Sequence, residues 1–484
     1  MTAAADTRWL DATAHAELFA SGKASSVELV QAAVDRIEAL DGPINAVVIR
    51  WFDDALAEAA DYDRRRAAGE ELGPFAGVPF LLKDLYAPMA GKPMTNGNKA
   101  LAEAMPISPS DSNLVARFRD AGLVIMGRTN SPELGSLSVT EPEAFGPTRN
   151  PWGLDHTPGG SSGGAAAAVA AGMVPFANAS DGGGSIRIPA SCAGLFGLKT
   201  SRGRISLGPF RDEAGLSVEF ALTRSVRDAA RLLDAVHGPG VGDGVIAPPP
   251  VRPYVDELGA DPGSLRIGIL DHHPADLPVH DDCVAAVRDA GALLESLGHR
   301  VEPGFPSVLA DASFSGRFIA MWGAGMKTGI DALGAMLGRE LTQDEVEPVN
   351  WAQVEFVKGM SAIDYSTALG AVADYRRQVQ SWWADGWDLL LTPTIAEPPP
   401  RIGEHANDPD DPLAPLMRAG EYVTFTPPFN TSGQPAMNLP LWWNDAGLPI
   451  GVQLVAAYGR EDLLLRLASQ VEAARPWADR RPSA

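Results

Sequence analysis

The chain has 484 residues, of which 45% are hydrophobic and 21% charged, a balance typical of a globular protein rather than a disordered, fibrous or disulfide-rich one. Its formal charge of -22 at pH 7 argues against binding to nucleic acid or to an anionic membrane, because clustered Lys and Arg hold such partners. Cys192 and Cys283 are too few and too far apart for a disulfide framework or a thiolate metal site. The start has no secretory-signal pattern and no apolar run is long enough to span a membrane, so we expect a cytoplasmic protein.

The first part of the chain predicts two helices and two strands. Residues 25–40 are amphipathic, begin with a serine–glutamate capping box and stop at the glycine–proline pair 42–43. Residues 78–82 form an unbroken apolar run, which predicts a buried strand with Lys83 at its end. Residues 111–130 combine a helical segment with the strand LVIMGRTN. Lys83 is therefore the lysine best placed for burial.

Two loops rich in glycine and serine follow, TPGGSSGG at 157–164 and SDGGGSIR at 180–187. Between them, AAAAVAAG predicts a helix whose small side chains allow close packing, and VPFANA predicts a short strand. Because the two loops flank one compact helix, we expect them to share one site.

The second half alternates strands and helices. Residues 241–253 are a proline-rich linker, after which SLRIGILD, residues 281–297 and HRVEPG predict strand, helix and strand. Residues 396–412 predict a loop, AMNLPLWW and PIGVQLVAAY predict strands, and the apolar spacing at 464–471 predicts a final helix. This alternation is typical of an α/β fold with a mainly parallel sheet.

The run Gly182–Gly184 before Ser185 is the feature most suggestive of chemistry. Glycine costs backbone entropy, so three in a row are expected where the backbone takes unusual dihedrals or approaches another group closely. Backbone N–H groups with no Cβ in the way suit an oxyanion formed in acyl transfer, with Ser185 as the attacking group. The plain alternative is a tight turn with a solvent-facing serine. The choice depends on whether a base can reach Ser185.

The eight histidines do not supply an evident base. Only His156 is near either loop, and nothing marks an aspartate partner for it. The stretch GGSSG at 159–163 matches the nucleophile-elbow pattern G-x-S-x-G, but the match recurs one residue later and no strand precedes it. A lysine can act if burial or neighbours lower its pKa from about 10.4. Lys83 fits this condition best, although no S-x-x-K pattern joins it to a serine.

Three ordered motifs resemble those of the amidase signature family. They are Lys83 within GVPFLLKDL, the tract TPGGSSGGAAAAVAAG, and SDGGGSIRIPASCAGLFGLKTSRGRIS. Ser161 and Ser185 are 24 positions apart, as in that family, and similarity extends from SSVELV near the start to GLPIGVQLVAAYGREDLLLRLASQVE near the end.

The resemblance implies an α/β amidase signature fold, with a large mixed, mostly parallel sheet covered on both faces by α-helices. It also implies a single amidase domain over residues 1–484. Within it, the signature core would cover about 70–210, the proline-rich connection 241–262, and the C-terminal part 263–484, which would complete the sheet and the substrate pocket.

The resemblance further implies a Ser-cisSer-Lys triad. Ser185 would be the nucleophile and Lys83 the terminal base, with Ser161 between them, reached through a cis peptide bond from Gly160. The oxyanion hole would be made by the backbone N–H groups of Gly182, Gly183, Gly184 and Ser185. No metal and no cofactor is implied.

Three neighbouring polar residues have expected supporting roles. Asp181 and Arg187 flank the glycine loop and can fix its backbone by charge-assisted hydrogen bonds, a role we favour over direct contact with substrate. Ser162 is expected to cap the alanine-rich helix and support Ser161, with contact to Lys83 as the alternative.

The expected function is hydrolysis of the C–N bond of a small-molecule carboxamide, through an acyl-enzyme, to a carboxylic acid plus ammonia or an amine. Carbamates, esters, aryl amides and nylon-type oligomers stay open as substrates. Gly182 stands where the family more often has Thr, which is similar to a subset that includes nylon-oligomer hydrolases. An amidotransferase A-type subunit fits less well, since those resemble GTDTGGSIRQPA.

Two other classes of protein are disfavoured. A non-catalytic binding protein of this fold would be expected to lack a triad residue, and all three are present. A phosphate cradle would need the pattern G-x-x-x-x-G-K-[ST], which the sequence lacks.

The family resemblance places the pocket walls in residues 86–94, 314–327 and 422–429. Their aromatics and methionines favour an apolar or aryl acyl group, while core packing explains the same residues equally well. The resemblance also implies a homodimer.

Overall fold

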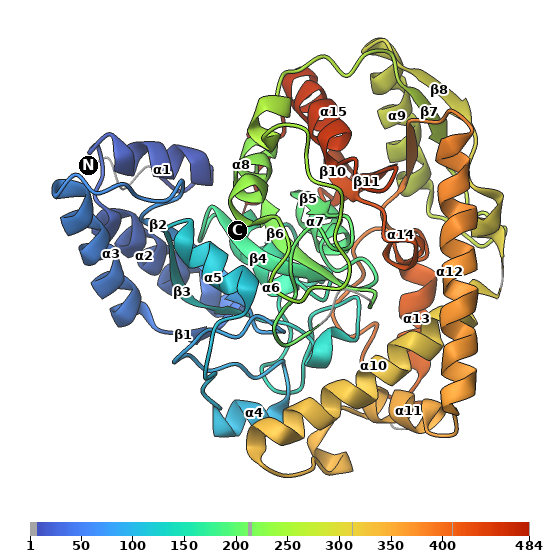
Figure 1. Ribbon diagram of the computed structural model, residues 1–484, viewed down its shortest axis with the longest axis horizontal. Coiled ribbons are helices and arrows are strands. Elements are labelled where there is room, and N and C mark those ends of the chain that lie inside the picture. The colour runs from blue at the N-terminus through green and yellow to red at the C-terminus, as the bar shows by residue number, and fades with distance from the viewer. Residues whose placement is uncertain (1–6, 212–214, 312, 409, 484) are drawn as a thin grey trace.

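The computed structural model describes residues 7–211, 215–311, 313–408 and 410–483, and its framework is a sheet of eleven strands. The strands are β1 (Val47–Arg50), β2 (Val78–Lys83), β3 (Leu123–Thr129), β4 (Phe176–Asp181), β5 (Phe196–Lys199), β6 (Val218–Thr223), β7 (Arg266–Ile269), β8 (Arg300–Pro303), β9 (Leu389–Pro393), β10 (Ala436–Trp443) and β11 (Pro449–Ala456). Their order across the sheet is β1-β3-β2-β4-β6-β5-β10-β11-β9-β7-β8. Strands from both halves of the chain thus join one sheet (Figure 1).

Helices surround this sheet. In chain order they are α1 (Ala12–Ala20), α2 (Ser26–Ile44), α3 (Phe52–Ala67), α4 (Lys99–Ala104), α5 (Asn113–Asp120), α6 (Gly163–Ala170), α7 (Arg187–Ala193), α8 (Val226–Val236), α9 (Asp281–Ser296), α10 (Phe314–Leu337), α11 (Pro348–Val357), α12 (Ala362–Ala384), α13 (Ala414–Tyr422), α14 (Pro427–Ser432) and α15 (Glu461–Ala474). Short 3-10 turns include η2 (Glu133–Gly135) and η3 (Tyr254–Glu257). Figure 1 shows α1, α2 and α3 at the left of the molecule and α12 at the right. No helix in the described ranges is both long and apolar enough to cross a membrane.

The expected large mixed α/β sheet is confirmed, but the expectation that it is mostly parallel is wrong. Six of the ten strand pairings are antiparallel and four are parallel. The alternation of strands and helices in the second half of the chain suggested a mainly parallel sheet. Instead, β6 inserts between β4 and β5 and runs antiparallel to both. The β10–β11 hairpin adds further antiparallel pairs at the centre.

Helix α2 shows how local signals set an element's ends. The expected capping box is present, because Ser25 Oγ accepts from the Glu28 N–H at 3.1 Å and the Ser25 N–H donates to Glu28 Oε2 at 2.8 Å. The prediction that the helix stops at residues 42–43 is wrong, because the helix continues one residue beyond Pro43. Pro43 is accommodated in the last turn, and the helix ends where Asn45 adopts a left-handed conformation, φ 57°.

Helices cover both faces of the sheet. Helix α7 packs on β5, β10 and β11. Helix α15 packs on β10 and β11 and also contacts α8. Helix α9 also packs on β9, β10 and β11. Helix α6 packs against α7 and against β2, β3, β4 and β6, and every one of its residues is buried. The main hydrophobic core fills the space between these layers.

The close packing of α6 predicts opposite effects for two glycine-to-alanine changes. A Cβ on Gly164 in α6 would lie 2.4 Å from the backbone N of Asn130 and 2.6 Å from its O, whereas nothing lies within 4 Å of a Cβ on Gly370 in α12. We expect Gly164→Ala to lower the free energy of unfolding by about 2 kcal/mol or more through overpacking. Gly370→Ala should raise it by about 0.5–1 kcal/mol, because glycine is costly inside a helix. Urea unfolding measures both, and an unchanged or more stable Gly164→Ala protein would contradict the packing described.

Candidate active site

Lys83 lies at the centre of a buried polar cluster. It is the last residue of β2, its side chain is fully buried, and its backbone N–H donates to Asn178 Oδ1 at 3.1 Å. Its Nζ is within hydrogen-bond distance of three hydroxyls, at 2.7 Å from Ser161, 3.0 Å from Ser162 and 3.0 Å from Ser180. Among the described residues, no carboxylate is bonded to this amine.

Burial changes the charge state of this lysine. Burial lowers the pKa of Lys83, the charges of Glu219 and Asp181 oppose this, Arg211 adds a smaller lowering, and the net pKa is about 7. An uncharged amine has two N–H donors and one lone pair, which three hydroxyls can satisfy, since each hydroxyl both donates and accepts. The cluster therefore accommodates an amine that can accept a proton at neutral pH.

The two glycine–serine loops meet beside this amine. The Gly160–Ser161 peptide bond is cis, and Ser161 is 2% exposed. A Cβ on Gly159 would lie 3.0–3.2 Å from atoms of α7, so the first loop packs against the helix that follows Ser185. Ser185 is 7% exposed. The described chain has no hydrogen bond between the hydroxyls of Ser161 and Ser185, a contact that often tightens only when a substrate is bound.

The glycine loop presents free backbone donors. Of the four N–H groups expected to bind an oxyanion, those of Gly182, Gly183 and Ser185 have no hydrogen-bond partner within the ranges described. The expectation for Gly184 is corrected, because its N–H donates to Asp181 Oδ1 at 2.7 Å and is already satisfied. Three of the four N–H groups, rather than all four, are therefore without a protein partner in the described ranges.

A side chain at each glycine of the loop would meet a different neighbouring group. Gly184 has φ 139°, and a Cβ on it would lie 2.3 Å from Thr426 Oγ1. A Cβ on Gly182 would lie 3.0 Å from Ser217 Oγ and 3.1 Å from Trp322, and one on Gly183 would lie 3.4 Å from Phe318. Neighbouring groups therefore leave no free space for a side chain at Gly184 and little at Gly182, whereas a Cβ on Gly183 would make only an ordinary van der Waals contact.

An ion pair fixes the loop from behind. Arg187 Nε and Nη2 donate to the two carboxylate oxygens of Asp181 at 3.0 Å each, and both side chains are fully buried. Burial by itself would raise the pKa of Asp181, but Arg187 holds it at about 2. The remaining Arg187 donors reach Gln453 Oε1 at 2.6 Å and Asn430 Oδ1 at 2.6 Å. The ion pair therefore ties the loop to α14 and β11.

Ser162 differs from its expected capping role. It stands at the N-cap of α6, but its side chain makes no capping hydrogen bond. Its Oγ instead lies near the Lys83 amine and donates to Ser180 O at 3.2 Å. The alternative that linked Ser162 to Lys83 is the observed arrangement, because the burial of Lys83 leaves its amine dependent on nearby hydroxyls.

Sequence reasoning missed Ser180 and Asn178. Both belong to β4, where positions 178 and 180 lie on one face of the strand, and β4 pairs with β2. Two polar residues at alternate positions of the otherwise apolar FANAS stretch were the available signal. Asn178 fixes the backbone of Lys83, and Ser180 completes the set of hydroxyls around its amine.

Two of the three segments expected to wall the pocket, residues 314–327 and 422–429, contact the glycine loop, and the third, residues 86–94, contacts Arg211. The rings of Phe318 and Trp322 stack at 5.4 Å over Gly182 and Gly183, as the Cβ distances above show. Thr426 Oγ1 donates to Gly183 O at 2.6 Å. The Tyr86 ring lies beneath the Arg211 guanidinium, 4.2 Å from its centroid.

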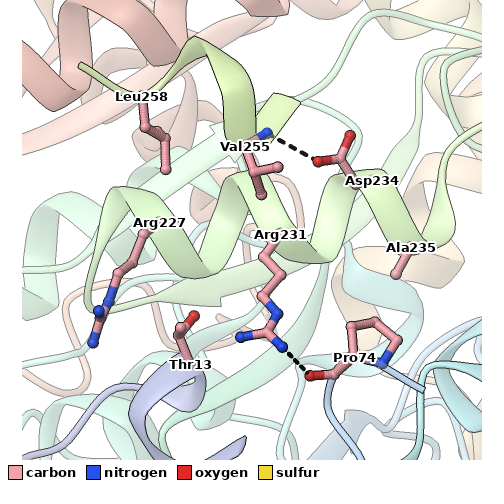
Figure 2. Close-up of a pocket in the computed structure, with 8 residues that line it drawn as sticks. All are labelled: Thr13, Pro74, Arg227, Arg231, Asp234, Ala235, Val255 and Leu258. Carbon is pink, nitrogen blue, oxygen red and sulfur yellow. Dashed lines mark hydrogen bonds between the residues drawn. The ribbon is translucent and has the colours of Figure 1, made fainter. Parts of the chain in front are cut away.

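A surface pocket elsewhere on the molecule is separate from this site. Figure 2 shows it between α8 and η3, where Arg231 donates to Pro74 O at 2.7 Å. Its lining contains none of the residues described above: it consists of Thr13, Pro74, Arg227, Arg231, Asp234, Ala235, Val255 and Leu258. This pocket is therefore not part of the site around Lys83 and the glycine loop.

Comparison with known proteins agrees with the motifs found in this site. Residues 28–465 match the Amidase family. The chain belongs to the amidase signature family. It is 43% identical to the 6-aminohexanoate-cyclic-dimer hydrolase of Paenarthrobacter ureafaciens, over 98% of this chain and 96% of that protein.

Solved structures agree with this assignment. The amidase superposes on a structure of 6-aminohexanoate cyclic dimer hydrolase with a TM-score of 0.94 and 43% identity, over 98% of this chain and 99% of the other. A bacterial aryl acylamidase of the amidase signature family matches with a TM-score of 0.88 and 30% identity, over 98% and 97% of the two chains. The protein is thus an amidase, a hydrolase of carboxamide C–N bonds with small-molecule substrates.

The buried ion pair of the amidase gives a stability prediction. Asp181→Asn would leave the Arg187 charge buried without its counter-ion, so we expect the free energy of unfolding to fall by about 3–5 kcal/mol. Asp374→Asn is the matched control, since Asp374 pairs with Arg377 on the surface with both side chains 70% exposed, and we expect no measurable change there. Urea unfolding of both variants measures the difference. Equal stabilities would contradict the role given to the buried pair.

Proposed function

We propose that this amidase hydrolyses amides through a relay of Ser185, Ser161 and Lys83. The uncharged Lys83 amine takes a proton from Ser161 Oγ, which takes one from Ser185 Oγ as that atom attacks the substrate carbonyl. The observation that carries the proposal is the 2.7 Å contact between Lys83 Nζ and Ser161 Oγ in a fully buried setting. The relay places a proton acceptor next to an otherwise weak nucleophile.

The tetrahedral oxyanion would be held by the glycine loop. We assign this role to the N–H groups of Gly182, Gly183 and Ser185, which have no partner elsewhere in the described ranges. The loss of one such donor typically lowers turnover about 100- to 1,000-fold. Gly184 supports the loop through Asp181 instead.

Collapse of the intermediate breaks the C–N bond and leaves an acyl group on Ser185 Oγ. The proton held on Lys83 returns through Ser161 to the departing nitrogen, which leaves as ammonia or an amine. Water then attacks the acyl-enzyme and gives up a proton through Ser161 to Lys83; as the bond to Ser185 Oγ breaks and the carboxylic acid leaves, that proton returns through Ser161 to Ser185 Oγ. The proton transfers in these steps use Ser185, Ser161, Lys83 and water.

The substrate we favour is an amide with an apolar or flat acyl group. The stacked Phe318–Trp322 pair against the glycine loop supports this choice. So do the names of two similar proteins, a 6-aminohexanoate-cyclic-dimer hydrolase and an aryl acylamidase. Nylon-type oligomers and aryl amides are therefore the first compounds to test, with carbamates and esters beside them. The cytoplasmic location and the homodimer stay predictions.

Turnover assays of serine variants test the nucleophile. We expect release of acid and amine from a panel of aliphatic amides, anilides, carbamates, esters and linear or cyclic ω-amino-acid oligomers. Ser185→Ala should lose at least about 10⁴-fold in kcat, as triad serines do. Ser108→Ala is the control, because Ser108 is a buried serine whose hydroxyl has no partner in the described ranges.

The outcomes separate the alternatives. Full activity of Ser185→Ala would refute the relay. Activity of the wild-type chain alone, without partner or ATP, would argue against an amidotransferase subunit.

The charge state of Lys83 predicts the pH profile. The amine is the base only when uncharged, and its pKa is about 7. We therefore expect kcat/KM to be level above that pH and to fall about tenfold per unit below it. Initial rates from pH 5.5 to 9, with thermal unfolding recorded at each pH to verify folding, measure the profile. A kcat/KM that stays constant down to pH 5.5 would exclude Lys83 as the base.

A further inference from the structure

Glu219 is a buried carboxylate next to the catalytic cluster that the relay does not use. It lies in β6 directly opposite Ser180 of β4 in an antiparallel ladder, so the two side chains stand on the same face of the sheet. Ser180 Oγ is 3.0 Å from Lys83 Nζ. Glu219 is 4% exposed. The ladder therefore places a carboxylate one side chain away from the amine.

Its position is fixed by a second charged residue. Arg211 Nη1 donates to Glu219 Oε1 at 2.8 Å, and the Arg211 guanidinium lies over the ring of Tyr86 at 4.2 Å. Tyr86 comes three residues after Lys83, and desolvation by its surroundings raises the pKa of its hydroxyl. Arg211 thus connects Glu219 to Tyr86, in the loop that follows Lys83.

We propose that Glu219 is a positioning residue for the amidase reaction, whose carboxylate sets the pH at which the Lys83 amine gains its proton. The proposal rests on Lys83 being the base in the proposed function. A negative charge beside an amine favours the protonated form. Without it, the buried amine would be harder to protonate and a weaker acceptor for the Ser161 proton.

The other charges that face Lys83 do not duplicate this role. In the described chain they are Asp181 at the end of β4 and Arg211 before β6. Asp181 is bonded to Arg187 and has a pKa of about 2, so its charge is constant over the working range. Burial raises the pKa of Glu219 to about 7, against the influence of Arg211 and Lys83. Glu219 is therefore the neighbour whose own charge changes in the range where Lys83 titrates.

The experiment compares the pH profiles of kcat/KM for the wild type, Glu219→Gln, Glu219→Asp and Glu302→Gln. Glu219→Gln should move the midpoint of the acidic limb about one pH unit lower, because a nearby opposite charge shifts a pKa by about 1–3 units. Glu219→Asp keeps the charge and should restore a midpoint close to that of the wild type. Glu302→Gln removes the same charge from β8, where the side chain is 46% exposed and pairs with Arg266, and should leave the midpoint unchanged.

The outcomes distinguish this proposal from the one it rests on. A wild-type limb near pH 7 that stays in place in Glu219→Gln, with only a lower plateau or lower stability, overturns the role of Glu219 alone. A wild type without an acidic limb overturns the base assignment and this proposal together. Should Glu219→Gln be inactive, the ¹³Cε resonance of Lys83 in lysine-labelled protein reports the same midpoint without turnover, and an unshifted value again overturns the proposal.

Discussion

The removal of the Lys83 amine from water is the constraint on which the rest of the site depends. A lysine in water holds its proton far above neutral pH, and it can serve as a base here because β2 delivers it into the interior with hydroxyls as its nearest partners. Three serines satisfy its hydrogen bonds without a formal negative charge in direct contact. A carboxylate bonded to the amine would have kept it protonated, so the use of hydroxyls is what leaves the lone pair available.

The surrounding fold holds the Lys83 amine and the glycine loop, a proton acceptor and a set of N–H donors, close together. The amine cluster sits where β2 and β4 run parallel, while the glycine loop leaves the end of β4 and enters α7. Asp181 at the end of β4 and Arg187 at the start of α7 flank the glycine loop and tie it to α14 and β11. Elements from both halves of the chain thus fix the loop, which explains why the sheet continues far beyond the motifs. Rigidity at this point matters because oxyanion donors work only if they are oriented before the reaction begins.

Much of this could be predicted from residues whose signal is local. An apolar run ending in Lys83, two glycine–serine loops and a capping box before α2 each depend on a few consecutive positions, and the structure places them as expected. The predictions that were wrong concern contacts between segments that are distant in the sequence. The insertion of β6 between β4 and β5, the use of the Gly184 N–H by Asp181, and the turn of Ser162 toward Lys83 each follow from pairing that no short stretch encodes. Glu219 is the same case, since only the β4–β6 register places it opposite Ser180.

The most direct test is to titrate Lys83 itself. The chain has seven lysines, so protein labelled with ¹³Cε-lysine gives few resonances, and the one that disappears in Lys83→Met identifies the residue. We expect this resonance to titrate with a midpoint near pH 7, as burial lowers the pKa of Lys83 to about 7. A resonance that stays at the position of a charged amine up to pH 9 would contradict it, because Lys83 could not then take a proton from Ser161 at neutral pH.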